Sequence, residues 1–424
     1  MNEVLEKLPR HLLDLVIDQP YNEYTAQDHA LWRYVMKQNV IYLGKMAHGS
    51  YTDGLQKTGI SIDSIPHMYG MNRILKEIGW AAVAVDGFIP PAAFREFQAY
   101  NVLVIASDIR PISQIEYTPA PDIIHEAAGH APIIADREYA EYLRLFGKIG
   151  CKAFSSAANH KVYEAIRHLS ILKTDPYTSK ENIAKAEQRV AALEQEGTSA
   201  SEMTLIRNLH WWTVEYGLIG DINKPKIYGA GLLSSIGESK HALSDQVKKL
   251  PFDLLAKDYN FDITSMQPQL FVTPDFAHLT DVLKEFEKQM ALSIGGTYGI
   301  TKAIESGSHA TCRYSSGLEV SGIFSNVITD GDDPVYLQSG SPTTLNYENK
   351  LLQGHGKGQH PDGFGSPVGK FKNVSTPPEL LTESALEKLG ISKNQEASLE
   401  FDSGVQVKGI LREATFKEGK LLLL

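Results

Sequence analysis

The chain has 424 residues, of which 42% are hydrophobic and 22% charged, and its formal net charge is -10 at pH 7. This length predicts about two to three domains, and the composition is typical of a folded globular protein. The acidic balance argues against a nucleic-acid partner, because a phosphate-binding face is basic.

The N-terminus and the cysteines indicate a cytoplasmic protein. The first residues, MNEVLEKLPRHLLDLVIDQPY, mix acids into their apolar positions and lack a small-residue cleavage site, so we expect no signal peptide. No apolar run approaches the ~20 residues of a membrane span. Cys151 and Cys312 lie far apart and build no disulfide framework. We therefore expect neither a membrane nor a nucleic acid as partner.

From Thr25 to about Ile294 the pattern is mainly helical. Residues 28–43 place apolar side chains near helical spacing, and Asp28 is the expected N-cap. Short helices are expected at 62–80 and 92–100, with an irregular loop, GFIPP, at 87–91 between elements. LVIAS, at 103–107, predicts a short strand.

The second half of this region continues the helical pattern. Asp136 is expected to start a helix in DREYAEYLRLFGKIG. Residues 180–203 are charged, poor in aromatics and helix-favouring, which predicts an exposed helical insertion, placed at about 152–205. Two further helices are expected, one containing residues 208–220 and an amphipathic one over 274–294.

Beyond residue 295 the pattern changes to short alternating runs. HATCRYSSGLEVSGIF and ASLEFDSGVQVKGIL carry Ser-Gly turn pairs and predict β-hairpins. We place a boundary near 296 and expect residues 296–424 to be a β-rich accessory domain, with no role that the sequence assigns. The glycine-rich stretch at 354–370 lacks the Gly-Lys-Ser/Thr ending of a phosphate loop, so we expect a mobile surface loop.

The stretch PDIIHEAAGH, residues 121–130, holds two histidines five positions apart. Asp122 is expected to begin a short helix, and Pro132 to end it near His130. In an α-helix, residues five apart lie about 140° apart around the axis, against about 40° for residues four apart. The motif is therefore not HExxH, and His125 and His130 share one ion only if one of them lies at a frayed helix end. The alternative is a pair of hydrogen-bonded core histidines.

A carboxylate in a later helix strengthens the metal interpretation. Glu215 lies in the apolar sequence HWWTVEYGLIG, where burial is costly without a cation or hydrogen bonds. A salt bridge to Arg110 or Arg207 is the alternative. Together, His125, His130 and Glu215 match the 2-His-1-carboxylate facial triad, which leaves coordination positions open and suits non-haem Fe(II) oxygen chemistry.

Three ordered motifs carry a family resemblance. YTPAPDIIHEAAGHAPIIAD, WWTVEYGL and KIYGAGLLSSIGE (226–238) closely resemble the pterin-dependent aromatic amino acid hydroxylases, and weaker similarity runs from about Tyr24 to Leu292. The resemblance implies a mainly α catalytic domain with short strands over 1–295, and iron ligands at His125, His130 and Glu215. It also implies tetrahydrobiopterin, or another tetrahydropterin, as cofactor.

The resemblance implies roles for further residues. Glu126 would hydrogen-bond the pterin, with Asp122 and Ser234 as the other expected catalytic residues, of which Asp122 supports His125 and Ser234 contacts the substrate. Phe94 would stack on the pterin ring, and the loop of Val85, Gly87, Phe88 and Ile89 would present backbone groups to it; a core aromatic and a plain loop are the alternatives. Arg110 would clamp the substrate carboxylate through a bidentate fork, Thr118 would contact its polar groups, and Pro121, Trp211 and Tyr216 would line the ring slot.

Some positions depart from the family pattern. Ala120 replaces an acid, Ala127 and Ala128 replace larger apolar residues, and His210 stands where a tyrosine is common. The expected activity is hydroxylation of L-phenylalanine to L-tyrosine with Fe(II), a tetrahydropterin and O2. Hydroxylation of tryptophan or of another ring position of phenylalanine is the near alternative, and a zinc hydrolase or a non-catalytic binding module is the distant one. The sequence does not support any particular oligomer.

Overall fold

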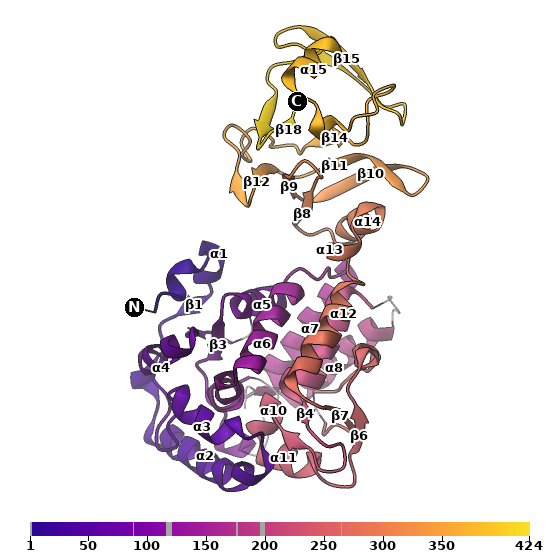
Figure 1. Ribbon diagram of the computed structural model, residues 1–424. Coiled ribbons are helices and arrows are strands. Elements are labelled where there is room, and N and C mark those ends of the chain that lie inside the picture. Colours follow the sequence, from indigo (N-terminus) through magenta and orange to yellow (C-terminus); the bar gives the residue numbers. More distant parts are fainter. Residues whose placement is uncertain (1, 88, 116–120, 175–176, 196–199, 264) are drawn as a thin grey trace. The chain divides into compact units, whose positions relative to one another are not determined.

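The computed structural model describes residues 2–87, 89–115, 121–174, 177–195, 200–263 and 265–424. The chain forms two compact units, Met1–Gln289 and Met290–Leu424 (Figure 1). The first is mainly helical and the second is rich in strands, which confirms the predicted fold class. Within the described ranges, no helix is long and apolar enough to cross a membrane.

Most of the first unit consists of helices connected by short turns. The longest, α2, has Thr25 as its N-cap, and Asp28 completes a capping box with it. The prediction of Asp28 as the N-cap was therefore wrong by one turn. The helices are α1 Arg10–Leu13, α2 Ala26–Met46, α3 Ser50–Lys57, α4 Met68–Leu75, α5 Pro91–Ala99, α6 Arg137–Gly150, α7 Ala157–Thr174, α8 Lys180–Gln195, α9 Glu202–His210, α10 Ala230–Leu233, α11 Ile236–Ala242 and α12 Phe276–Glu287.

The region before the first long strands was only partly predicted. The helix expected at 62–80 begins at Met68, after Pro66, and ends at Ile78 as a 3-10 turn. A residue before proline avoids helical geometry, which explains the late start. The strand β2, Ala81–Val85, was not predicted, because its sequence AAVAV contains three alanines, which are poor strand formers.

Two small sheets stand among these helices. In the first, β1 (Val16–Ile17) pairs antiparallel with β2, and β2 pairs parallel with β3 (Val102–Ala106). Helix α5 connects β2 to β3, and Phe97 on it packs against valines of both strands. The second sheet has the order β5-β4-β7-β6, formed by Lys226–Ile227, Leu218–Ile219, Gln269–Thr273 and Lys248–Pro251.

Glycines let three backbones come close around the His-containing segment. A Cβ on Gly54 of α3 would lie 1.9 Å from the Pro132 carbonyl oxygen. A Cβ on Gly147 of α6 would lie 2.4 Å from the Ala99 nitrogen at the end of α5. Asp136 caps α6 by accepting from the Glu138 and Tyr139 amides, as predicted. The segment before α6 is therefore held on a closely packed frame.

The second unit contains the predicted hairpins. Strands β8 (Ala310–Arg313) and β9 (Leu318–Gly322) pair antiparallel, as do β15 (Glu396–Glu400) and β16 (Gln406–Ile410). The turn residues Gly317 and Gly404 have φ of +92° and +82°, values that favour glycine. The other elements are α13 Ala291–Ile294, α14 Gly296–Ser306, β10 Phe324–Asp330, β11 Asp333–Ser339, β12 Thr344–Tyr347, β13 Lys350–Leu351, β14 Gly365–Pro367, α15 Glu383–Lys388, β17 Thr415–Lys417 and β18 Lys420–Leu423.

The glycine-rich stretch at 354–370 is hydrogen-bonded to its neighbours. The carbonyl oxygens of His355 and His360 accept from the Leu345 and Thr343 amides, both at 3.0 Å. Farther along, β14 pairs with β11. The stretch is therefore not the irregular loop that its glycine content suggested, because glycine content alone does not reveal backbone hydrogen bonds to a strand, and its mobility stays a prediction.

Candidate active site

His125, His130 and Glu215 form a compact cluster of possible metal ligands. The two Nε2 atoms lie 3.2 Å apart, and each lies 3.3 Å from an oxygen of Glu215. An ion about 2.1 Å from each donor keeps neighbouring donors about 3 Å apart, which fits these spacings. Two imidazoles and one carboxylate match the facial triad, so the residues present fit the ferrous ion that the sequence predicted.

Two π-helical segments bring the three ligands together. Ile124–His130 is a π-helix, and so is Trp211–Glu215, where the Tyr216 amide donates to the Trp211 carbonyl five residues back. In a π-helix the hydrogen bonds join residues five apart, so residues at this spacing become neighbours on one face. The prediction of a frayed helix end was therefore wrong. The π-helix ends at His130, which confirms the end predicted from Pro132, and a separate 3-10 turn, Ala131–Ala135, follows, in whose first turn proline is tolerated.

Ser234 sets the orientation of the His125 ring. Its hydroxyl donates to the Ala230 carbonyl at 2.8 Å, so its oxygen is left to accept from His125 Nδ1–H at 3.1 Å. This places the proton on Nδ1 and leaves the Nε2 lone pair directed at the cluster. Asp122 supports the same residue by accepting from the His125 backbone amide at 3.0 Å.

Arg110 is paired with Asp122. Arg110 Nε and Nη2 donate to the two carboxylate oxygens at 2.8 and 2.7 Å, and both side chains are buried. Burial acts to raise the pKa of Asp122, but the guanidinium outweighs it and holds the pKa below its usual range. The two N–H groups of Arg110 that were expected to bind the substrate carboxylate therefore bind Asp122 instead. Arg110 pairs with Asp122 and not with Glu215, so the alternative of an Arg110–Glu215 salt bridge was wrong. Nη1, 3.4 Å from the Ser234 carbonyl, and the second N–H of Nη2 are the donors that Asp122 does not use.

The two glutamates of the site have opposite electrostatic environments. Burial acts to raise the pKa of Glu215, but His130 and His125 outweigh it and hold the pKa well below its ordinary value. Glu126, whose carboxyl lies 3.8 Å from His130 Nε2, has its pKa raised to about 8, chiefly by burial. Glu126 is therefore protonated at neutral pH without a bound cation and presents a hydroxyl donor.

Two residues at the site had no predicted role. His210 Nδ1 lies 3.7 Å from Glu215 Oε1, and burial lowers the pKa of His210 to about 3. Glu238 is buried and hydrogen-bonded to Tyr216, and burial raises its pKa to about 7. The signal for Glu238 was an acid inside the apolar stretch KIYGAGLLSSIGE, the same signal that singled out Glu215.

The other expected site residues are more scattered. Trp211 stacks on Tyr216 with ring centroids 4.6 Å apart, and also on Phe261 at 4.1 Å. Phe94 meets His210 edge-on at 6.0 Å. In the loop expected to face the pterin, Val85 is the last residue of β2, Gly87 has φ of +62°, and the Ile89 carbonyl accepts a hydrogen bond from the Tyr163 hydroxyl. Pro121, expected in the ring slot, is partly exposed. Phe88 and Thr118 lie outside the described residues. The pterin and substrate roles of these residues stay predictions.

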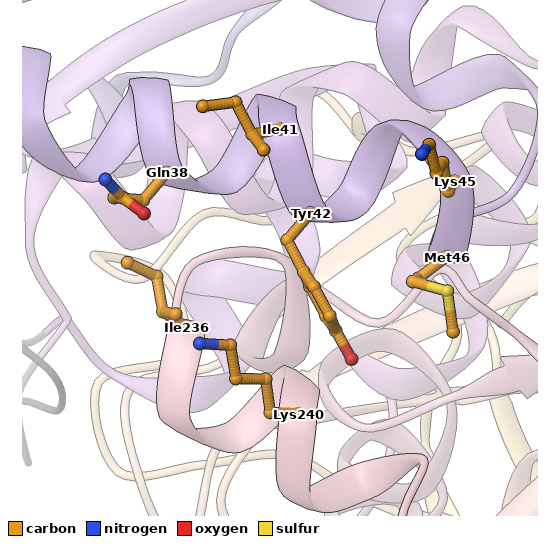
Figure 2. Close-up of a pocket in the computed structure, with 7 residues that line it drawn as sticks. All are labelled: Gln38, Ile41, Tyr42, Lys45, Met46, Ile236 and Lys240. Atoms are coloured by element: carbon orange, nitrogen blue, oxygen red, sulfur yellow. The ribbon is translucent and has the colours of Figure 1, made fainter.

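A separate hollow of about 390 Å³ lies between α2 and α11. Figure 2 shows Tyr42 on α2 and Lys240 on α11, whose side chain rises toward α2, and Lys240 Nζ lies 5.9 Å from the centre of the Tyr42 ring. The lining residues are Gln38, Ile41, Tyr42, Lys45, Met46, Ile236 and Lys240. None of them is a metal ligand, so this hollow is distinct from the candidate active site.

The fold and the His-His-Glu cluster define an iron- and pterin-dependent hydroxylase. The model of the biopterin-dependent aromatic amino acid hydroxylase family matches residues 17–161 and 155–308, and the chain belongs to this family. Both predicted cofactors, iron and biopterin, are confirmed at the level of the family. The match ends inside the second compact unit, so the boundary predicted near 296 stays a prediction.

Among curated relatives, phenylalanine-4-hydroxylase of Chromobacterium violaceum is 28% identical over 271 residues, 63% of this chain and 76% of that protein. The Pseudomonas aeruginosa phenylalanine-4-hydroxylase is 27% identical over 272 residues, covering 63% and 86%. Tryptophan 5-hydroxylase of Xenopus laevis is 28% identical over 286 residues, covering 66% and 50%. The solved C. violaceum phenylalanine hydroxylase with iron(III) and 7,8-dihydrobiopterin aligns with a TM-score of 0.52 and 26% identity, covering 65% and 86%.

Proposed function

We propose that the protein hydroxylates L-phenylalanine to L-tyrosine with Fe(II), a tetrahydropterin and O2. The observation that carries the proposal is the His125–His130–Glu215 cluster, in a chain whose bacterial relatives are phenylalanine-4-hydroxylases. An iron ion held by these three groups supplies the means to bind and reduce O2, since one carboxylate leaves net positive charge and open positions.

The chain's own residues prepare the reactants. The carboxyl group of Glu126 hydrogen-bonds the pterin, and Phe94 with Val85, Gly87 and Ile89 forms the pterin wall. Trp211 and Tyr216 line the slot for the substrate ring, and because Trp211 is stacked between Tyr216 and Phe261 it meets the substrate with its edge. Arg110 reaches the substrate carboxylate through the N–H groups of Nη1 and Nη2 that Asp122 does not use, while Asp122 holds the guanidinium in place.

Hydroxylation of tryptophan is the second candidate. The X. laevis tryptophan 5-hydroxylase is as similar in identity as the C. violaceum phenylalanine-4-hydroxylase, 28% in each case. Shape complementarity in an apolar slot discriminates weakly between rings, so a dual specificity is compatible with the same cluster.

The decisive experiment is turnover of purified protein loaded anaerobically with Fe(II), then given tetrahydrobiopterin, air and an equimolar mixture of L-phenylalanine and L-tryptophan. Mass spectrometry and chromatography against standards identify the product and the ring position. We expect L-tyrosine as the main product. His130→Ala removes a ligand and abolishes turnover, whereas His309→Ala, at an exposed histidine of the second unit, retains it.

Two outcomes would overturn the proposal. Hydroxytryptophan as main product, or phenylalanine oxidised at another ring carbon, would reassign the substrate or the ring position. Bound zinc together with no pterin-dependent O2 uptake would favour the hydrolase alternative.

A further inference from the structure

His210 is an imidazole beside the metal cluster that no ligand role accounts for. It ends α9, and the π-helix with Glu215 begins at the next residue. Its side chain is 12% exposed, with Nδ1 facing Glu215 Oε1 at 3.7 Å. Its Nε2 is buried and has no hydrogen-bond partner among the described residues.

The carboxylate of Glu215 needs a donor that the two histidine ligands cannot provide. Its oxygens face His125 Nε2 and His130 Nε2. A cation bound by the cluster takes the lone pairs of these two nitrogens, so neither carries an N–H toward the carboxylate. Carboxylates that bind metals are usually held by a further hydrogen bond, which fixes their orientation.

The surroundings of His210 decide which of its nitrogens carries the proton. Placing the proton on Nε2 would bury an N–H without an acceptor and point the Nδ1 lone pair at a carboxylate oxygen. Placing it on Nδ1 directs an N–H at Glu215. Phe94 and Phe146 meet the ring edge-on, with centroids 6.0 and 5.3 Å away, so apolar groups confine it.

We propose that His210 is a positioning residue for the metal site, donating Nδ1–H to Glu215 Oε1 and holding that carboxylate in its ligating orientation. Closing the gap from 3.7 Å to a normal length of about 2.9 Å requires less than about 1 Å of side-chain movement. The inference rests on the family's iron site and is independent of which amino acid is hydroxylated.

A different role would be simple space filling between Phe94 and Phe146. His210→Phe keeps an aromatic ring there and removes the donor. His210→Gln and His210→Met form a second pair, similar in length, of which only glutamine offers an N–H. His278→Phe is the matched control, because it removes a half-buried imidazole bonded to the Phe252 carbonyl and not to the cluster.

The test is a titration of the metal-free full chain with Co(II), followed by the visible absorption of the bound ion. Co(II) binds nitrogen and oxygen sites somewhat more tightly than Fe(II) and reports its coordination directly. Loss of an orienting partner costs about 10–100-fold in metal affinity. We expect this loss, with an altered spectrum, in His210→Phe and His210→Met, affinity restored to within a few-fold in His210→Gln, and no change in His278→Phe.

Wild-type affinity and spectrum in His210→Phe would overturn the inference and leave space filling. If His210→Phe fails to fold, as shown by its thermal melt, equal affinities of the Gln and Met variants would overturn it in the same way. Failure of the wild-type protein to bind Co(II) or Fe(II) would instead refute the proposed function, so the two failures are distinguishable.

Discussion

Gly129 offers the sharpest test of how tightly the ligand segment is held. It precedes His130 in the π-helix, and a Cβ added there would lie 2.6 Å from the Ala230 carbonyl oxygen and 3.2 Å from its carbon. Real Cβ atoms essentially never come within 3.0 Å of such an atom. The obstacle is backbone of α10, the helix that leads to Ser234 and so to the His125 ring.

Gly129→Ala must therefore push the π-helix and α10 apart. Overpacking of this kind costs about 1–3 kcal/mol, against a gain of up to about 1 kcal/mol from replacing a helical glycine. The segments that separate carry His130 and the partner of His125, so part of the strain also weakens metal binding. Each 1.4 kcal/mol lost there lowers affinity about tenfold.

Urea unfolding of the metal-free protein measures the first effect, and Co(II) titration measures the second. Gly44→Ala is the control, since Gly44 lies inside α2 with nothing within 4 Å of the added Cβ. That substitution should stabilise the protein by up to about 1 kcal/mol. A Gly129→Ala protein as stable as wild type, with unchanged affinity for Co(II), would show that α10 does not limit the ligand segment.

Three further predictions follow from the charges of the site. Glu238→Gln should leave the free energy of unfolding near the wild-type value below about pH 4.5 and raise it by at most about 3 kcal/mol above pH 7. The reason is that the wild type loses the stability given by protonated Glu238 as pH rises through the raised pKa of this group, about 7. Urea unfolding of both proteins from pH 5 to 8.5 tests this, and a constant difference between them across that range contradicts it. Arg110→Ala should lower the free energy of unfolding by about 3–5 kcal/mol, because it leaves the buried carboxylate of Asp122 without its partner. It should also reduce iron content, because Asp122 accepts from the His125 backbone amide and so supports a metal ligand. Full iron occupancy in a stable variant would leave Arg110 with the role of a substrate clamp alone. Fe(II) at a hundred times its Kd should stabilise the wild type by about 2.7 kcal/mol in anaerobic thermal unfolding, and an equal shift in Glu215→Ala would place the metal elsewhere.

Much of the architecture was predictable from local signals. The cap at Asp136, the hairpin turns at Gly317 and Gly404, and the change from helical to alternating patterns each depend on a few neighbouring residues. The strand AAVAV was missed, because its place beside β3 and under α5 decides its conformation more than its alanines do.

The metal ligands were predictable as residue types, but their geometry was not. An apolar helix with one glutamate and a pair of histidines indicated the cluster, while the π-turns that align them depend on backbone hydrogen bonds that no spacing rule gives. The Arg110–Asp122 pair and the approach of His210 to Glu215 each join side chains that only the tertiary fold brings together.

In the π-helix Ile124–His130, hydrogen bonds join residues five apart, so the alignment of His125 with His130 depends on the number of residues between them. Excising Ala128 would turn HEAAGH into HEAGH, which has the form of the HExxH zinc motif, and a regular α-helix would then align the two imidazoles. One inserted or lost residue, with the accompanying change in helical winding, therefore separates the local pattern of an oxygen-activating iron site from that of a hydrolytic zinc site.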